Sequence, residues 1–366
     1  MILEEPPSHS LMPLNILRNH AELEGIRAAW RRLESRGTHP TQQFIWMKAC
    51  AEIFARPGEL RIVQLEEDGE TIAIAPLIAR QASRRWEFLG MDETQEPTDA
   101  LYADARAARS LAAGLVALRV PLAMERIPEA SQLPAAFENA CRLRGLCIRR
   151  QAAAYPSLEL RASDGEHITP LNSGRRSDLR RAERKAREMG VVSYEMLSPT
   201  PETVGTLLEQ AMSVEASSWK LQAKTALVLD AVLADFYKTF TYAASEQGVL
   251  RLSFLRIGGR AAAMQLAVEA HGRLWLFKIG YDEHFARCSP GNLLLQEVIR
   301  HCAKQGLKSI DFLGTVEPWT RNWTQRETSC LMLRSYPPTL AGGVDLAQDA
   351  LQAIIKKMTR RAGDRK

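Results

Sequence analysis

The sequence predicts an α/β (α+β) protein of two similar halves, each with a mixed, mostly antiparallel sheet flanked by helices. Three observations predict this fold. Residues 44–90 align without a gap to residues 234–280, so the chain contains an internal repeat. Asp-Gly and Gly-Gly pairs lie between apolar runs in the two copies, and such pairs are hairpin signals. The length of 366 residues suits two domains of about 150 residues each.

Each copy of the repeat predicts a helix followed by three strands. The turn between the first two strands is "EEDGE" in one copy and "IGGR" in the other. The matched positions include Gly58 with Gly248, Leu60 with Leu250, Arg61 with Arg251, Gly69 with Gly259, Gly90 with Gly280, and Trp46 with Phe236. The identities are few, so chance similarity between helix–hairpin units is the alternative to duplication.

The halves differ after the third strand. The first continues through "MDETQEPTDALYAD" to an Ala-rich helix that starts near Ala105. The second passes through "ARCSPGN" into a helix, which is followed by a strand over 309–314. The free N–H groups and positive dipole end of a helix start bind anions. The Pro-Gly turn is therefore a candidate phosphate site, and an ordinary helix start capped by Ser289 is the alternative.

Strand alternation assigns faces to the polar side chains of the second half. Along "FKIGYDE", Phe277 and Ile279 are expected on one face and Lys278 on the other. In "SIDFLG", Asp311 is expected opposite Ile310 and Phe312.

A strongly basic helix is predicted between the halves, from Ser173 or Ser177 as N-cap to just before Gly190. Its cations are Arg175, Arg176, Arg180, Arg181, Arg184, Lys185 and Arg187. A solvated helix face, an acceptor-phosphate site, and a surface for nucleic acid or anionic lipid are all open interpretations.

The tail "DLAQDALQAIIKKMTRRAGDRK" predicts an amphipathic helix with a basic end. We place an N-terminal lobe at 1–165, a C-terminal lobe at 166–336 and this tail at 337–366. The tail helix either packs on the protein or contacts a membrane surface.

Composition bounds the class of protein. Apolar residues make up 46% and charged residues 25%, which is typical of a globular protein, and the net charge of +5 does not argue for nucleic acid. The six cysteines lack metal-site spacing, so we expect no metal and a reduced cytoplasmic environment. The acidic, Pro-rich N-terminus does not read as a signal peptide, and no apolar run suits a spanning helix.

Several motifs together resemble a known family. They are "RRSDLRRAERKAREMG", "SSWK", "DFYKTF", "FKIGYDEHFARCSPGNLLLQEVI" and "IDFLG", in this order. They are similar to the GNAT-type acyltransferases of the CelD/BcsL family of cellulose and exopolysaccharide biosynthesis. That family resembles in turn the FemABX transferases, which are tandem GNAT folds. The likeness covers about residues 30–323.

The resemblance implies two tandem GNAT-like lobes, with acyl-CoA, such as acetyl-CoA, as co-substrate in the second lobe. The family's pyrophosphate loop reads Q/R-x-x-G-x-G/A, and residues 287–292 keep the Arg and one Gly but lack the Gly at the fourth position. The residues expected to bind the cofactor are Arg287, Ser289, Gly291, Asn292 and Leu293. Those expected at the substrate are Arg175, Arg181, Lys185, Trp219, Lys220 and Lys278.

Acyl transfer to an amine needs a proton acceptor and an oxyanion donor. We predict Asp311 and Asp282 as candidate bases and Tyr281 as a candidate acid. No Cys or Ser has a recognisable His partner, which argues against an acyl-enzyme. Proton transfer is therefore assigned to a carboxylate or tyrosine acting directly on the bound substrates.

The resulting prediction is a GNAT-family N-acyltransferase that acylates an amino sugar or lipid-linked glycan precursor by direct transfer in a ternary complex. It would work in the cytoplasm, with possible peripheral membrane contact through the tail helix. A FemABX-like transferase that uses aminoacyl-tRNA is one alternative. A non-catalytic subunit of a polysaccharide synthase system is another.

Overall fold

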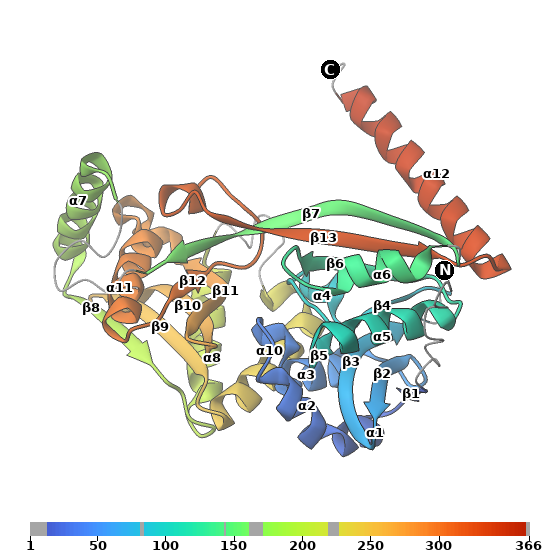
Figure 1. Ribbon diagram of the computed structural model, residues 1–366. Coiled ribbons are helices and arrows are strands. Elements are labelled where there is room, and N and C mark those ends of the chain that lie inside the picture. Colours follow the sequence, from blue (N-terminus) through green and yellow to red (C-terminus); the bar gives the residue numbers. More distant parts are fainter. Residues whose placement is uncertain (1–12, 81–83, 143, 161–170, 219–226, 364–366) are drawn as a thin grey trace, which may run out of the picture.

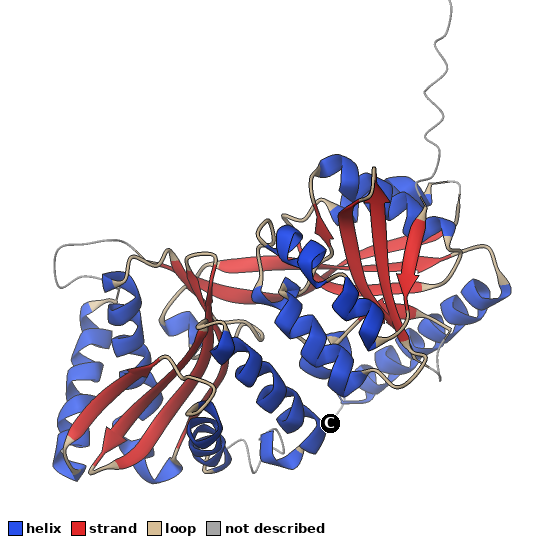
Figure 2. Cartoon of the chain, turned by 90° about the horizontal axis from the view of Figure 1, so that it is seen from below, coloured by secondary structure: helices blue, strands red, loops and turns tan. Residues whose placement is uncertain are grey.

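The computed structural model of the protein describes residues 13–80, 84–142, 144–160, 171–218 and 227–363. The strands join in one 13-stranded sheet with the order β1-β2-β3-β4-β6-β13-β7-β12-β11-β10-β9-β8, and β5 pairs with β3. Figure 1 shows two lobes side by side, and Figure 2 shows helices covering the strands of both. The predicted mixed α/β architecture is confirmed.

The first lobe contains the N-terminal elements. Its strands are β1 (Leu14–Leu17), β2 (Leu60–Glu67), β3 (Glu70–Ala79), β4 (Trp86–Phe88), β5 (Leu101–Tyr102) and β6 (Leu122–Pro128). Its helices are α1 (His20–Gly25), α2 (Arg27–Glu34), α3 (Phe44–Phe54), α4 (Met91–Thr94), α5 (Ala105–Ala117) and α6 (Leu133–Cys141), with a short 3-10 helix η1 (Pro40–Gln42).

The second lobe repeats this order. Its strands are β8 (Val192–Leu197), β9 (Leu250–Ile257), β10 (Arg260–Ala270), β11 (Arg273–Tyr281) and β12 (Ser309–Asp311). Its helices are α7 (Ser173–Met189), α8 (Val204–Ala216), α10 (Ala231–Glu246) and α11 (Pro290–Lys304), with 3-10 helices η2 (Leu227–Leu229), η3 (Glu283–Cys288) and η4 (Thr320–Asn322).

The internal repeat is visible in the coordinates. Strands β9 and β10 begin 190 residues after β2 and β3, as the alignment predicts. Even a side-chain contact is repeated: Arg61 Nη1 donates to the Gly58 carbonyl at 2.7 Å, and Arg251 Nη1 donates to the Gly248 carbonyl at 2.7 Å. A shared hydrogen bond at matched positions favours duplication over chance similarity.

Two long strands tie the lobes together. β7 (Leu146–Glu159) pairs with β13 (Glu327–Tyr336) in the first lobe and with β12 in the second. β13 also pairs with β6, so a segment from the end of the chain completes the first sheet (Figure 1). The lobes therefore exchange strands, while the predicted boundary at residue 165 remains a prediction.

The lobes also share a core where α3 packs against α10. The Trp46 ring lies 4.9 Å from Phe236 and 4.8 Å from Phe240, in edge-to-face geometry, and stacks on Phe277 of β11. Trp46 and Phe236 are matched repeat positions, so the two copies meet face to face. This contact fixes one lobe against the other and so sets the geometry of any site between them.

Candidate functional site

The sheet opens between β11 and β12. These parallel strands pair over three positions, ending at Trp275 and Asp311. β11 then continues to Tyr281, and no described strand pairs with residues 276–281 on that side. We call this opening the fork. An unpaired strand edge presents N–H and C=O groups that an extended ligand can use.

A β-bulge lies where the fork begins. In the pairing with β10, Leu276 aligns with Ala267 but Lys278 aligns with Leu266, which leaves Phe277 as the extra residue. The predicted alternation is therefore wrong. Phe277 packs in the interlobe core and Ile279 packs on the opposite face of the sheet. Lys278 points to the interlobe side, with Nζ 5.0 Å from the Tyr237 ring centroid.

The turn before α11 offers fewer free N–H groups than expected. Ser289 adopts φ 48° and makes no side-chain cap bond. Its own N–H donates to the Ala286 carbonyl, and the N–H groups of Asn292 and Leu293 donate to the Ser289 carbonyl. Among the predicted cradle donors, Gly291 N–H alone makes no hydrogen bond within the described residues. The phosphate role of this turn stays a prediction.

Side chains around the turn are mostly engaged. Arg287 Nε lies 3.2 Å from the Met189 sulfur at the end of α7. Asn292 Oδ1 accepts from Trp323 Nε1 at 3.3 Å. Tyr281 is half-buried, and its hydroxyl makes no hydrogen bond among the described residues. Tyr281 is thus the predicted residue with a free polar group beside Gly291.

Asp282 has a structural environment. Its Oδ1 accepts from His284 N–H at 2.9 Å, which caps η3, and its Oδ2 accepts from Arg260 at 2.9 Å. A carboxylate with both oxygens occupied is poorly placed to take a substrate proton. Asp282 therefore fits the role of holding the turn.

Asp311 lies on the interlobe side of β12, opposite Ile310 and Phe312, as alternation predicted. It is fully buried, accepts from Ser309 Oγ at 2.7 Å, and pairs with Arg273 at 3.6 Å. Its Oδ1 has no partner among the described residues. The carboxylate sits at the closed end of the fork, where the two strands are still paired.

A polar pair lies beside Asp311. His39 Nε2 is 2.7 Å from the Tyr155 hydroxyl, and the His39 ring packs 4.9 Å from Trp275. Burial, together with the positive charge of Arg273, lowers the pKa of His39 to about 3. Burial and the charge of Asp311 raise the pKa of Tyr155. Both side chains are therefore neutral at physiological pH, which suits a structural network.

The mouth of the fork holds a buried carboxyl that sequence reasoning missed. Glu96, from the loop after α4, is 7% exposed, and its Oε2 accepts from the Gly314 N–H at 3.3 Å. Gly314 follows β12, so Glu96 reaches the fork from the first lobe. Burial raises the pKa of Glu96, which the charges of Arg126 and Lys278 oppose only in part.

Arg126 fixes this loop in place. It donates to the carbonyls of Gln95 and Gly314, so it joins the first-lobe loop to the segment after β12. Its Nε is buried without a partner among the described residues. A buried carboxyl with a raised pKa beside a cation, at an opening in a sheet, is typical of a functional site.

The basic helix α7 packs through Leu179, Ala182 and Ala186 against η3 and α11, next to the turn. Its N-cap is Asn172, which accepts from the Arg175 N–H at 2.8 Å, so the predicted serine caps are wrong. The other face carries a shallow depression lined by Ser177, Arg180, Arg181, Glu183, Arg184 and Arg187.

The predicted substrate residues of α7 do not converge on the fork. Arg175 contacts Asn322 Oδ1, Arg181 pairs with Asp178 at 3.6 Å on the surface, and Lys185 is exposed. Trp219 and Lys220 lie outside the described residues. No group of three His, Cys, Asp or Glu side chains suited to a metal occurs among the described residues.

Residues 173–321 match the family model described as Acetyltransferase (GNAT) domain. The second half is a GNAT-type domain. The finer assignment to the CelD/BcsL family stays a prediction. A search of curated proteins gives no match to the sequence.

Solved structures share the fold over most of the chain. The C-terminal domain (DUF2156) of a putative lysylphosphatidylglycerol synthetase from Agrobacterium fabrum is 12% identical, with TM-score 0.58, covering 92% of this chain and 97% of that one. L-PGS from Bacillus licheniformis is 11% identical, with TM-score 0.54, covering 90% and 96%. FemX is 11% identical, with TM-score 0.54, covering 89% and 97%. At these identities the likeness concerns the fold alone.

Proposed function

We propose that the protein is an acyl-CoA-dependent N-acyltransferase whose donor lies in the fork and whose acceptor amine approaches Glu96. One observation carries the proposal. β11 runs six residues past its last pairing with β12, and a buried carboxyl from the other lobe stands at the resulting opening. The GNAT match of the surrounding segment supports a thioester donor.

The fork suits an extended donor. The free edge of residues 276–281 offers backbone N–H groups for the thioester carbonyl, and Gly291 N–H at the start of α11 offers a contact for phosphate. Such donors stabilise the oxyanion that develops as the carbonyl is attacked. Lys278 and Arg126 place positive charge near Glu96 and keep part of its carboxylate form available.

The chemistry is a direct transfer. The acceptor nitrogen attacks the thioester carbonyl carbon, the new C–N bond forms, and the C–S bond breaks. Glu96 takes the proton that the nitrogen loses, directly or through water. The departing thiolate receives a proton from the Tyr281 hydroxyl, which solvent then restores. In this assignment Asp311 and Asp282 position the fork and the turn.

The acceptor class comes from the resemblance of the sequence to exopolysaccharide enzymes. We therefore propose an amino sugar or a glycan precursor, acting as a small-molecule or lipid-linked substrate. An amine of this kind must lose a proton as it is acylated, which is the task given to Glu96.

A rival donor, an aminoacyl-tRNA, has its own support. Four arginines line the outer face of α7 beside the turn, and the turn has few free N–H groups for a pyrophosphate. Fold neighbours named FemX and lysylphosphatidylglycerol synthetase add to this possibility. Basic helices of this kind suit an RNA backbone.

Calorimetric titration with acetyl-CoA and longer acyl-CoAs tests the proposal. Wild-type protein is expected to bind with micromolar affinity, and Gly291→Arg to lose binding, because a side chain there meets Tyr281. Gly205→Arg is the matched control: nothing lies within 4 Å of a Cβ at Gly205, so binding should persist. If folded wild-type protein binds no CoA thioester, the acyl-CoA proposal fails, and titration with aminoacyl-tRNA then separates the rival from a non-catalytic role.

A further inference from the structure

The C-terminal helix α12 (Leu340–Gly363) contacts the protein through its acidic side chains. Asp345 and Asp349 lie 2.8 and 2.7 Å from Arg85 Nη2, and Asp349 also accepts from Arg334 at 2.6 Å. Burial alone would raise the pKa of Asp349, but hydrogen bonds from Arg85, Arg334 and Tyr336 lower it to about 2. The inward face of this helix is therefore its charged face.

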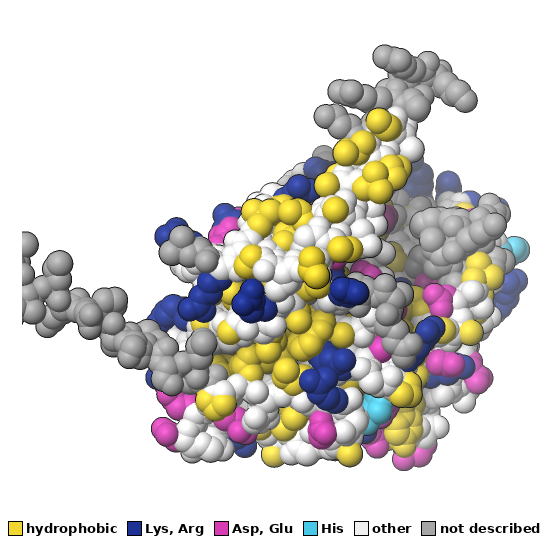
Figure 3. All heavy atoms as spheres, turned by 90° about the vertical axis from the view of Figure 1, so that its right-hand side faces the viewer, with side chains coloured by type: hydrophobic (Ala, Val, Ile, Leu, Met, Phe, Trp, Pro, Cys, Tyr) yellow, Lys and Arg dark blue, Asp and Glu magenta, His cyan; other side chains and the backbone are white. Residues whose placement is uncertain are grey.

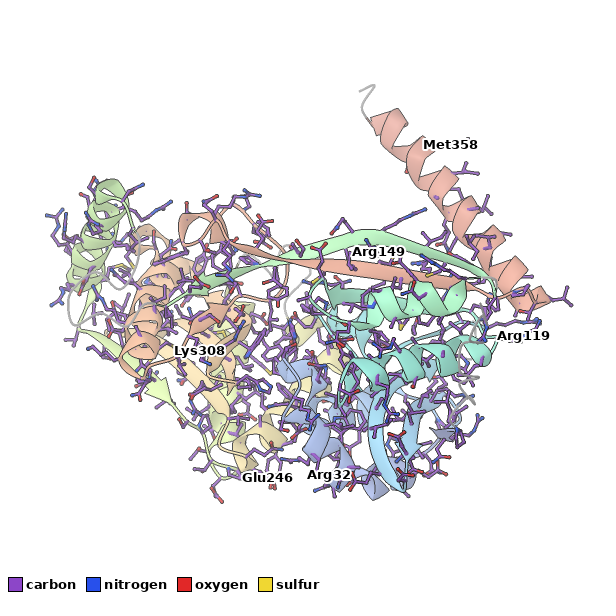
Figure 4. All side chains as sticks on the ribbon, viewed as in Figure 1. Arg32, Arg119, Arg149, Glu246, Lys308 and Met358 are labelled. Carbon is purple, nitrogen blue, oxygen red and sulfur yellow. The ribbon has the colours of Figure 1, made fainter. Side chains whose placement is uncertain are left out.

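The apolar face of α12 turns the other way. Its large apolar side chains are about half exposed or more: Leu340 (88%), Val344 (51%), Leu351 (58%), Ile354 (51%), Ile355 (52%) and Met358 (66%). At 3.6 residues per turn these positions share a stripe about 100° wide, and Asp345 and Asp349 lie on the opposite side. Figure 3 shows apolar side chains along the projecting helix, and Figure 4 marks Met358 near its far end.

This orientation is the reverse of an ordinary surface helix, which buries its apolar stripe in the core and exposes its polar face. A contiguous exposed apolar stripe marks a contact with a membrane or another protein. The polar inward face and outward apolar face leave the stripe available to something outside the chain.

The charge around the stripe favours an anionic surface. Residues 356–366 contain six Lys and Arg and one acidic residue. Exposed arginines also surround the base of the helix: Arg119 donates to the Pro338 carbonyl, Arg84 adjoins Arg85, and Arg142 and Arg144 precede the Gly145 that packs against Tyr336. Cations flanking an apolar helix face are typical of helices that lie in the interface of an anionic bilayer.

A second copy of the chain is a poorer occupant. In a heptad register with Val344, Leu351 and Met358 at a, the e positions are Ala341, Gln348, Ile355 and Ala362, and the g positions are Gly343, Ala350 and Lys357. Coiled-coil pairs usually select partners through charges at e and g, and only one of these positions is charged.

We propose that α12 is an interfacial helix that lays its apolar stripe into the headgroup region of an anionic lipid bilayer and so holds the protein at a membrane surface. Among the described residues, no helix is long and apolar enough to cross a bilayer. The contact is therefore peripheral, and it is independent of which donor the fork takes.

Vesicle flotation of the full chain tests this proposal. Large vesicles of equal parts phosphatidylglycerol and phosphatidylcholine are expected to carry the protein, and vesicles of phosphatidylcholine alone to carry far less. Salt should weaken the binding because it screens the basic residues. Ile354→Asp with Ile355→Asp should weaken partitioning by about tenfold or more, since two charges enter the buried stripe.

Val232→Asp is the matched control, because Val232 on α10 is as exposed (53%) as Ile355 but lies outside the stripe. It should bind vesicles like wild type. Light scattering reports the oligomeric state of the same samples, and circular dichroism confirms folding. Equal flotation of the double variant and wild type, or a wild-type dimer that the double variant dissolves, would overturn the lipid assignment.

Discussion

The two lobes share a frame but differ at the fork. In the first lobe, β4 pairs with β6 at Trp86 and Glu87 and ends one residue later. Met91 of α4 then fills the gap, and its sulfur accepts from the Glu125 N–H at 3.2 Å. In the second lobe, β11 continues for six residues beyond its pairing, and the gap stays open. One copy closed the opening that the other retains.

The difference suggests a division of roles after duplication. The first lobe, with its own fork closed, sends the loop after α4 across the interface, where Glu96 meets Gly314. The second lobe keeps the open strand edge and the turn before α11. A site assembled in this way needs both lobes, which explains why they share a core and exchange strands.

The largest expected effect comes from Glu96. Glu96→Gln keeps the size and the hydrogen-bond acceptor but removes the base, so transfer should fall about 10²- to 10⁴-fold. Donor affinity should be unchanged by calorimetry. Glu87→Gln is the control from the closed lobe: burial raises the pKa of Glu87 to about 6, yet its carboxylate pairs with Arg80 outside the fork. Equal losses in both variants would contradict the assignment.

The interface between the copies should be the next most sensitive region. Trp46→Ala and Phe236→Ala each empty a fully buried aromatic site at matched positions, so each should lower the free energy of unfolding by about 3 to 5 kcal/mol. Because the rings touch, the double variant should lose less than the sum. Urea unfolding measures all three. Strictly additive losses would argue against a shared core.

Two matched glycines should fail for different reasons. A Cβ at Gly280 would lie 2.8 Å from the Glu215 Cα, so Gly280→Ala should cost about 1 to 3 kcal/mol by overpacking. Gly90 has φ +78°, so Gly90→Ala adds about 1 to 2 kcal/mol of backbone strain to its contact with Cys50. Gly205→Ala has open space and should be neutral or slightly stabilising. Thermal unfolding distinguishes the three.

The smallest effect concerns pH. Since burial raises the pKa of Glu96, the carboxylate is lost as pH falls through a value above the ordinary 4.5. The acidic limb of kcat/KM should therefore lie above that value, and Glu87→Gln should leave it in place. Arg126→Gln removes an opposing charge, so the limb should move to still higher pH. A limb that ignores Arg126 would point to another base.

The sequence predicted the local features well and the long-range ones poorly. The repeat register placed β2, β3, β9 and β10 because hairpin turns are encoded by adjacent Gly residues. The exchange of β13 into the first sheet, the bulge at Phe277 and the reach of Glu96 across the interface depend on distant segments. The acidic loop "MDETQEPTD" was visible as a difference between the halves, but nothing in one sequence shows that it meets Gly314.

Hydrogen–deuterium exchange with and without acetyl-CoA tests the central claim most directly, because it compares the open and closed forks in one molecule. Protection confined to residues 276–293, together with the Glu96 loop, is the predicted result. Equal protection of residues 86–94, or protection of the first lobe alone, would contradict the claim that only the second lobe kept a working fork.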